Sequence, residues 1–257
     1  MGVAIVTGAA RGIGAAIADA LAADGHQLVL IDRASNDDRL DYALATEEEL
    51  RSVAQRVGGE VVVGDVAELE THRRAVAAAE RLGGVDIAIA SAGVMAGTVP
   101  AWEVTDDAWN AMLGTNLGGT TQLARAAIPA MLDRAGPRHG RFVAISTSIA
   151  LKATPQLAGY AASKAAVLSF VRSMAADLRG TGITANVIQP GSTDTDLLAH
   201  SAAVYDLDDP AEFAQHHLNE RLLQPTEIAA AAAWLCSPAA SAITGIVLPV
   251  DGGMTAT

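Results

Sequence analysis

A tyrosine and a lysine four residues apart are the side chains of this chain best suited to chemistry. The segment from Tyr160 to Lys164 reads Tyr-Ala-Ala-Ser-Lys, and apolar residues follow at helical spacing. A helix would place both side chains on one face. A free tyrosine, with a pKa of ~10, is a poor base at neutral pH, but a nearby cation favours its phenolate. The pair therefore suits a general base for an alcohol, although the same spacing is typical of ordinary surface pairs.

A glycine-rich turn near the start of the chain could hold a phosphate group. Residues 3–6 are apolar and lead into residues 7–14, which read Thr-Gly-Ala-Ala-Arg-Gly-Ile-Gly, before an alanine-rich amphipathic segment. This pattern predicts a strand, a turn and a helix. Gly8 and Gly12 would let the backbone approach a pyrophosphate, which the N-terminus of the helix would bind, and Gly14 would let that helix pack closely on a sheet. The spacing G-x-x-x-G-x-G departs from the commoner G-x-G-x-x-G dinucleotide pattern.

These two segments together resemble the short-chain dehydrogenase/reductase family. The resemblance extends along essentially the whole chain, and its motifs occur in the family's order. The further matching positions are Asp65, Ser91-Ala92-Gly93, Asn116, Pro190-Gly191 and the closing Val250-Asp251-Gly252-Gly253.

Composition and periodicity favour one α/β domain over residues 1–257. The chain is 51% hydrophobic, enough to bury one sizeable core. After the first strand, strand-like runs alternate with alanine-rich helical stretches. The runs are residues 27–31, 61–64, 87–90, 141–146, 184–189 and 246–250. This alternation predicts a doubly wound parallel sheet with helices on both faces, the Rossmann fold.

Charge, cysteine and hydropathy patterns argue against several other classes. The net charge of -12 disfavours nucleic acid or an anionic membrane as a partner. The single cysteine, Cys236, excludes an intramolecular disulfide, and no H-E-x-x-H or C-x-x-C spacing accompanies the histidines, so we expect no metal. There is neither a signal-peptide core nor an apolar run of membrane-spanning length, so we expect a cytoplasmic protein.

Asp32, which follows the second apolar run, determines the expected cofactor. In dinucleotide folds a carboxylate here accepts hydrogen bonds from the adenosine ribose and repels a 2′-phosphate, which favours NAD over NADP. Arg33 follows directly; it could in principle hold a phosphate, but an arginine here is equally typical of a solvated loop.

The resemblance assigns further residues to NAD. Asp65 and Val66 match the family's adenine-binding pair, and the backbone at Thr193 and the side chain of Thr195 would hold the carboxamide. Residues 90–91 read Ala-Ser where the family more often has two asparagines, so the contacts of the missing asparagine must be absent or replaced. The full implied set is Gly8, Arg11, Gly12, Ile13, Asp32, Arg33, Asp65, Val66, Ser91, Ala92, Gly93, Tyr160, Lys164, Pro190, Gly191, Thr193 and Thr195.

The implied catalytic set is Asn116, a hydroxyl, Tyr160 and Lys164. Lysine would lower the pKa of the phenol and bind the nicotinamide ribose, and the asparagine would hold a helix kink and a water leading to the lysine. The family's serine usually lies 13 residues before the tyrosine, which corresponds to Thr147 in this chain. Threonine also has a hydroxyl, but its methyl group restricts χ1, so the neighbouring Ser148 is an alternative.

Residues 33–49 form an unusually long link after the second strand. The first half is rich in Asp and Asn and predicts a loop, while Thr46 and Glu49 predict a helix cap. One interpretation is a tolerated surface insertion. The other is a resemblance to the actinobacterial branch associated with the peptide redox cofactor mycofactocin and to carveol-dehydrogenase-like enzymes, where such an insertion covers the adenine side of NAD. Tyr42 and Leu44 would then shield a retained cofactor, whose electrons would pass to an external acceptor.

A substrate lid is expected over about residues 192–223. Its apolar residues could form a wall against the substrate, although each could equally pack the lid onto the body. The expected wall residues are Leu197, Leu198, Val204, Tyr205, Leu207 and Phe213, with Met95 and Leu151. The resemblance also implies a homotetramer.

These observations predict an NAD-dependent oxidoreductase acting on a small hydrophobic secondary alcohol or ketone. Two alternatives remain: an NADPH-linked carbonyl or 3-oxoacyl reductase, and a dinucleotide-binding regulator without catalysis. Asp32 argues against the first alternative, and the presence of both Tyr160 and Lys164 argues against the second.

Overall fold

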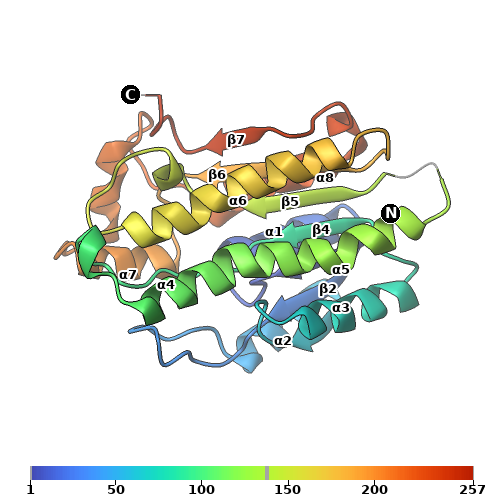
Figure 1. Cartoon of the computed structure of the whole chain (residues 1–257), viewed down its shortest axis with the longest axis horizontal. Helices are drawn as coiled ribbons and strands as arrows, with labels where there is room; N and C mark the ends of the chain where they lie inside the picture. Colours follow the sequence, from blue (N-terminus) through green and yellow to red (C-terminus); the bar gives the residue numbers. More distant parts are fainter. Residues whose placement is uncertain (1, 137–138, 257) are drawn as a thin grey trace.

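A parallel sheet with helices on both faces forms the body of the protein (Figure 1). The structure is a computed structural model and describes residues 2–136 and 139–256. The strands lie in the order β3-β2-β1-β4-β5-β6-β7, and every neighbouring pair is parallel. They are β1 Val3–Thr7, β2 Gln27–Asp32, β3 Glu60–Val63, β4 Ile87–Ala90, β5 Arg141–Ile145, β6 Thr184–Pro190 and β7 Val247–Val250. The predicted doubly wound fold is confirmed, and the strand limits differ from the predicted ones by about one residue.

Two apolar cores lie on the two faces of the sheet. Neighbouring strand residues point to opposite faces, so Ile5 and Val29 belong to one core while Val6 and Leu30 belong to the other. The first core is covered by α3 Leu69–Arg81, α5 Gly119–Asp133 and α6 Ala158–Asp177. The second is covered by α1 Gly12–Ala23, α2 Glu47–Val57 and α8 Pro225–Cys236. Cys236 is buried in the second core, and burial raises the pKa of its thiol to about 12.

The carboxyl ends of the strands carry the longer connections. In Figure 1 the blue loop of residues 33–46 and the orange helix α7, Asp196–Val204, both lie at the end of the sheet toward which the strands point. The same region holds α4, Asp106–Met112, and the π-helical turn Leu113–Gly118. Strand order reverses between β1 and β4, and in open parallel sheets ligands bind at the carboxyl ends beside such a reversal.

Shorter 3-10 turns complete these connections. They are η1 Ala101–Glu103, η3 Ser148–Ala150, η4 Pro210–His216 and η5 Pro238–Ala240. Among the helices of the described residues, none combines the length and the apolar character needed to cross a membrane.

Candidate active site

Two adjoining clefts open at the carboxyl ends of the strands. We call the first the loop cleft, because Tyr42, Leu44 and Ala45 of the long loop line it. We call the second the tyrosine cleft, because Tyr160 and Lys164 line it. The two clefts share the wall residues Ile13, Ser91, Gly93, Thr195 and Leu197. Because they share these walls, the two clefts form one continuous groove.

The predicted glycine turn forms one wall of the loop cleft. Gly8 and Gly12 have φ of 65° and 56°, a left-handed backbone that favours glycine. A Cβ on Gly14 would lie 1.9 Å from the carbonyl oxygen of Gly8, so only glycine lets α1 approach this closely. No side chain caps α1, whose N-cap residue is Arg11, and its first residues line the cleft. The turn therefore fits a pyrophosphate, which such a helix end would bind through N–H groups.

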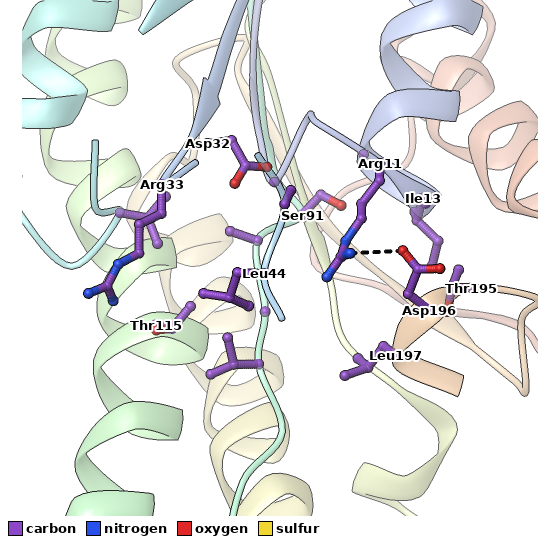
Figure 2. Close-up of a pocket in the computed structure, with 18 of the residues that line it drawn as sticks. Arg11, Ile13, Asp32, Arg33, Leu44, Ser91, Thr115, Thr195, Asp196 and Leu197 are labelled. Atoms are coloured by element: carbon purple, nitrogen blue, oxygen red, sulfur yellow. Dashed lines mark ion pairs between the residues drawn. The ribbon is translucent and has the colours of Figure 1, made fainter. Parts of the chain in front are cut away.

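Asp32 and Arg33 lie together at the far end of the loop cleft (Figure 2). The carboxylate of Asp32 accepts hydrogen bonds from the backbone N–H groups of Ala10 and Ala34, at 3.1 and 3.4 Å. Burial raises its pKa. The guanidinium of Arg33 is bound to carboxylates and is not a free solvated group. Its Nη1 lies 3.3 Å from Asp65 Oδ2 and 2.6 Å from Asp37 Oδ2.

Thr7 holds the turn after β4. Its Oγ1 accepts hydrogen bonds from the N–H groups of Ser91 and Ala92, at 3.0 and 3.1 Å, and donates to the carbonyl of Ile89. These bonds fix the backbone at residues 91 and 92, at the end of the pair 90–91 where the family more often has asparagine, so Thr7 supplies part of the support there.

Helix α6 brings Tyr160 and Lys164 to the tyrosine cleft, as the spacing predicted. Both are nearly inaccessible, with exposed fractions of 8% and 3%. Lys164 Nζ donates a hydrogen bond to the carbonyl of Ile145 at 2.9 Å. A Cβ placed on Gly93 would lie 2.9 Å from the same Nζ, so glycine leaves the room that the lysine occupies.

The expected lowering of the tyrosine pKa is wrong for this structure. Burial raises the pKa of Tyr160, and the neighbouring Tyr42 adds to the rise. Burial also lowers the pKa of Lys164 to about 8. The reason is desolvation: both groups sit away from water, which disfavours phenolate and ammonium alike.

Thr147, and not Ser148, faces the tyrosine cleft. Thr147 lies among the residues that line it. Ser148 is fully buried and its Oγ donates to Asp251 Oδ2 at 3.3 Å, behind the cleft wall. Ser146, on the other side, donates to the backbone carbonyl of Lys164. Of the two hydroxyls left open by the sequence, Thr147 is therefore the one placed to touch a substrate.

Asn116 supports the site from behind and lines neither cleft. It lies in the π-helical turn before α5, in keeping with the expected helix irregularity. Its side-chain amide exchanges two hydrogen bonds with the backbone of Val94, at 2.8 and 2.9 Å, and Nδ2 also donates to Ser163 Oγ. Asn116 thereby ties the loop after β4 to α6. Its expected water-mediated link to the lysine stays a prediction.

The long loop closes over the first cleft. Thr46 and Glu49 form the predicted capping box at the start of α2. Tyr42 OH accepts a hydrogen bond from the N–H of Met95 at 3.0 Å, and Arg11 donates to the carbonyl of Ala43 at 2.8 Å. These bonds fasten the loop across the cleft to elements on its opposite side.

Helix α7 connects the two clefts. Leu197, Leu198 and Ser201 line the tyrosine cleft. On the loop side, Asp196 forms an ion pair with Arg11 at 2.9 Å, drawn as the dashed line in Figure 2. His200 Nε2 lies 3.3 Å from Asp41 Oδ1, and the ring centroids of His200 and Tyr42 are 4.4 Å apart. The lid helix and the long loop are thus joined directly.

Part of the predicted substrate wall is wrong. Met95, Leu197 and Leu198 line the tyrosine cleft, but Leu151, the C-cap residue of the 3-10 turn η3, is 68% exposed to solvent. The other predicted wall residues lie outside the lining of that cleft: Val204, Tyr205, Leu207 and Phe213. Tyr205 instead packs against the apolar cluster that includes Tyr160 and donates its hydroxyl to the carbonyl of Pro155.

Several lining residues escaped the sequence reasoning. They are Asp37, Thr115 and Asp196 in the loop cleft, and Ile149, Ser201 and Met254 in the tyrosine cleft. Ser201 could have been found, because it lies one helical turn after Leu197 and Leu198. Met254 follows the closing glycine pair, and only the folded chain brings it to the tyrosine cleft. In the part of the chain that the structure describes, no group of three or more His, Cys, Asp or Glu is placed to hold a metal.

Comparison with known proteins gives the same assignment along the whole chain. Residues 8–255 match a family model described as enoyl-(acyl carrier protein) reductase. An uncharacterized NAD-dependent oxidoreductase of Mycobacterium tuberculosis is 36% identical, over 98% of this chain and 94% of the relative. The 3-oxoacyl-[acyl-carrier-protein] reductase FabG of Escherichia coli is 35% identical, over 98% and 96%. The crystal structure of carveol dehydrogenase from Mycobacterium avium in complex with NAD superposes with a TM-score of 0.90 at 29% identity, covering 100% of this chain and 98% of that one.

Proposed function

Because the chain belongs to the short-chain dehydrogenase/reductase family, we propose that it is an NAD-dependent oxidoreductase that interconverts a small hydrophobic secondary alcohol and its ketone. The observation that carries this proposal is the convergence of Tyr160, Lys164 and Thr147 on one cleft that is continuous with a glycine-turn cleft ending at Asp32. A dinucleotide laid along this groove would bring its reactive end to the tyrosine.

The residues present fit NAD. Gly8, Gly12 and the uncapped end of α1 suit the pyrophosphate, and Asp32 suits the hydroxyls of the adenosine ribose. Thr193 and Thr195 lie in the tyrosine cleft, where the nicotinamide carboxamide would bind. When bound, NAD would accept the hydride in alcohol oxidation, and NADH would donate it in ketone reduction.

Tyr160 moves the proton of the reaction. In ketone reduction its phenol, kept protonated by burial, donates a proton to the carbonyl oxygen. In alcohol oxidation its phenolate takes the hydroxyl proton. Burial opposes this phenolate, and the positive charge of the Lys164 ammonium would offset part of that cost. The hydroxyl of Thr147 holds the substrate oxygen. Asn116 positions the loop after β4 and is not itself in contact with substrate.

The substrate is apolar around its reacting carbon. Met95, Ile149, Leu197, Leu198 and Met254 surround the reactive hydroxyls in the tyrosine cleft. No arginine is among the residues lining that cleft, which disfavours a phosphate or carboxylate near the reacting group. A terpenoid or alicyclic alcohol fits this wall. The carveol dehydrogenase named among the similar structures supports the same class.

Reduction of a 3-oxoacyl group with NADPH is the second candidate. The similarity to FabG of Escherichia coli favours it, whereas Asp32 at the ribose position disfavours NADPH. Oxidation of cyclic secondary alcohols and reduction of 3-oxoacyl thioesters, each assayed with both cofactors, separates the two. With an artificial electron acceptor present to reoxidise a retained cofactor, we expect oxidation of the alcohols with NAD; exclusive turnover of the thioester with NADPH would overturn our proposal in favour of the second candidate.

We also propose that NAD is retained between turnovers and passes its electrons to an external acceptor. The long loop and α7 are fastened over the loop cleft by Arg11, Tyr42 and His200. Mass spectrometry of the denatured, freshly purified protein should then find near-stoichiometric NAD or NADH. A nucleotide-free protein that turns over with added NAD would contradict retention and leave the dehydrogenase proposal intact.

A further inference from the structure

Asp37 lies at the centre of a charge network at the end of β2. Its side chain belongs to the long loop, yet it is only 8% exposed and lines the loop cleft. Arg33 Nη1 lies 2.6 Å from its carboxylate. Arg39 binds the same carboxylate through both Nε, at 2.8 Å, and Nη2, at 2.5 Å, and also donates its backbone N–H. One buried carboxylate therefore holds two guanidinium groups.

Arg33 occupies a position from which an arginine could recognise a 2′-phosphate. It follows Asp32 directly, at the strand end where the adenosine ribose binds in dinucleotide folds. Its guanidinium, however, has Asp37 and Asp65 as partners, and in Figure 2 it points away from the carboxylate of Asp32. Both contacts use Nη1, and the two carboxylates offset the positive charge that would otherwise attract a further anion.

We propose that Asp37 is a specificity-determining residue, which excludes NADP by holding Arg33 and Arg39 away from the position of a 2′-phosphate. This inference rests on the proposed use of NAD. Asp32 repels the phosphate directly, whereas Asp37 withdraws the cations that would otherwise attract it. Specificity built from repulsion together with removal of a compensating attraction is a general way to reject a close analogue.

The arrangement predicts that changing Asp32 alone does not create an NADP enzyme. Asp32→Ala removes one repulsive carboxylate and the ribose contact, but Arg33 stays bound to Asp37. Combining Asp32→Ala with Asp37→Asn removes the carboxylate that binds Arg39 and leaves Arg33 paired with Asp65 alone, and we expect NADPH to bind about tenfold tighter than to Asp32→Ala alone. Adding Arg33→Ala to this pair should remove most of the gain.

Isothermal titration calorimetry with NADH and NADPH tests the proposal, on protein freed of retained nucleotide with activated charcoal. The readout is the ratio of the two affinities, so a general loss of binding in the altered loop does not obscure it. Asp38→Asn is the matched control, because Asp38 is the exposed neighbour and loses the same charge. Asp37→Glu, which keeps the carboxylate, should retain the preference for NADH.

Each outcome decides one question. A rise in the NADPH ratio with Asp37→Asn, absent with Asp38→Asn and reversed by Arg33→Ala, supports the role of Asp37. Equal ratios for the Asp37→Asn and Asp38→Asn variants in the Asp32→Ala background overturn it and leave the proposed function standing. A wild-type protein that binds neither nucleotide contradicts the proposed function itself.

Discussion

At the scale of single residues, burial sets the protonation states of the two titratable groups in the tyrosine cleft. Tyr160 and Lys164 both lie in a region that disfavours their charged forms, and the pKa of Lys164 falls to about 8. The ammonium remains the main form at neutral pH, at a cost in folding stability. Substrate and cofactor would therefore bind beside the protonated phenol of Tyr160 and the amine of Lys164, which loses its proton near pH 8.

This cost gives a pH-dependent prediction for Lys164→Met. The pKa of Lys164 is about 8 in the folded protein against 10.5 ordinarily, so between these values the unfolded chain binds more protons and stability rises with pH. Removing the charge should stabilise the protein at about pH 7 by roughly 2 kcal/mol and abolish turnover. Urea unfolding at about pH 7 and about pH 10 measures this gain. A gain of the same size at both pH values would show that the charge is not its cause.

The two neighbouring hydroxyls should separate activity from stability. Thr147→Ala removes the group facing the cleft, and we expect kcat/KM to fall about a hundredfold or more, with Thr147→Ser restoring most of it. Ser148→Ala instead removes the hydrogen bond to Asp251 and should cost about 1 kcal/mol of stability with activity largely kept. Steady-state kinetics and thermal unfolding of the three variants check this. Loss of activity confined to Ser148→Ala would reverse the assignment.

Site residues could be predicted from the sequence where they belong to a motif with a fixed spacing. The helix that carries Tyr160 and Lys164 and the glycine turn before α1 could be predicted because each is a local element, and their roles in binding and catalysis stay predictions. The choice between Thr147 and Ser148 could not be made, because it depends on where Asp251, far along the chain, meets the turn after β5. The raised pKa of Tyr160 was missed because burial is a property of the fold, not of spacing.

At the scale of elements, the long loop and α7 work as one cover. His200 of α7 joins Asp41 and Tyr42 of the loop, while Asp196 of α7 joins Arg11, which also holds the loop at Ala43. The opposite side of α7 lines the substrate region. Any movement of α7 therefore strains the cover of the loop cleft as well.

We predict that His200→Ala weakens this cover and speeds cofactor release. Loss of the contact with Asp41 and of the ring contact with Tyr42 should raise the dissociation rate of bound NADH about tenfold, because each contact of this kind contributes on the order of 1 kcal/mol. Stopped-flow fluorescence with a chase of excess NAD measures that rate. His216→Ala, an exposed histidine of the following 3-10 turn, is the matched control. Equal rates in the two variants would contradict a joint cover.

The helices and strands were predicted better than the contacts between them. Alternating apolar runs predicted the strands, and Thr46 with Glu49 predicted the start of α2, because both signals are local. Neither signal predicts the contact between residues 33–46 and α7. These two segments lie far apart in the chain, and the fold of the sheet brings them together. Leu151 was misplaced for the same reason, since its exposure depends on the direction of η3.

At the scale of the whole molecule, we propose a homotetramer, as the family resemblance implies. Sedimentation velocity should then give a single species of four times the chain mass, independent of cofactor. A monomer across the micromolar range would contradict it. Residence in the cytoplasm likewise stays a prediction of the sequence.

The central claim is that Tyr160 drives proton transfer while hydride passes between a secondary alcohol and NAD. Its most direct test follows deuterium from a cyclic secondary alcohol labelled at the carbinol carbon into the nicotinamide ring, by mass spectrometry of the denatured enzyme. We predict one deuterium per chain in the wild type, and a rate reduced by about a hundredfold or more in Tyr160→Phe, with Tyr205→Phe close to wild type. Failure of any such alcohol to label the nicotinamide, or equal labelling rates in wild type and Tyr160→Phe, would contradict the claim.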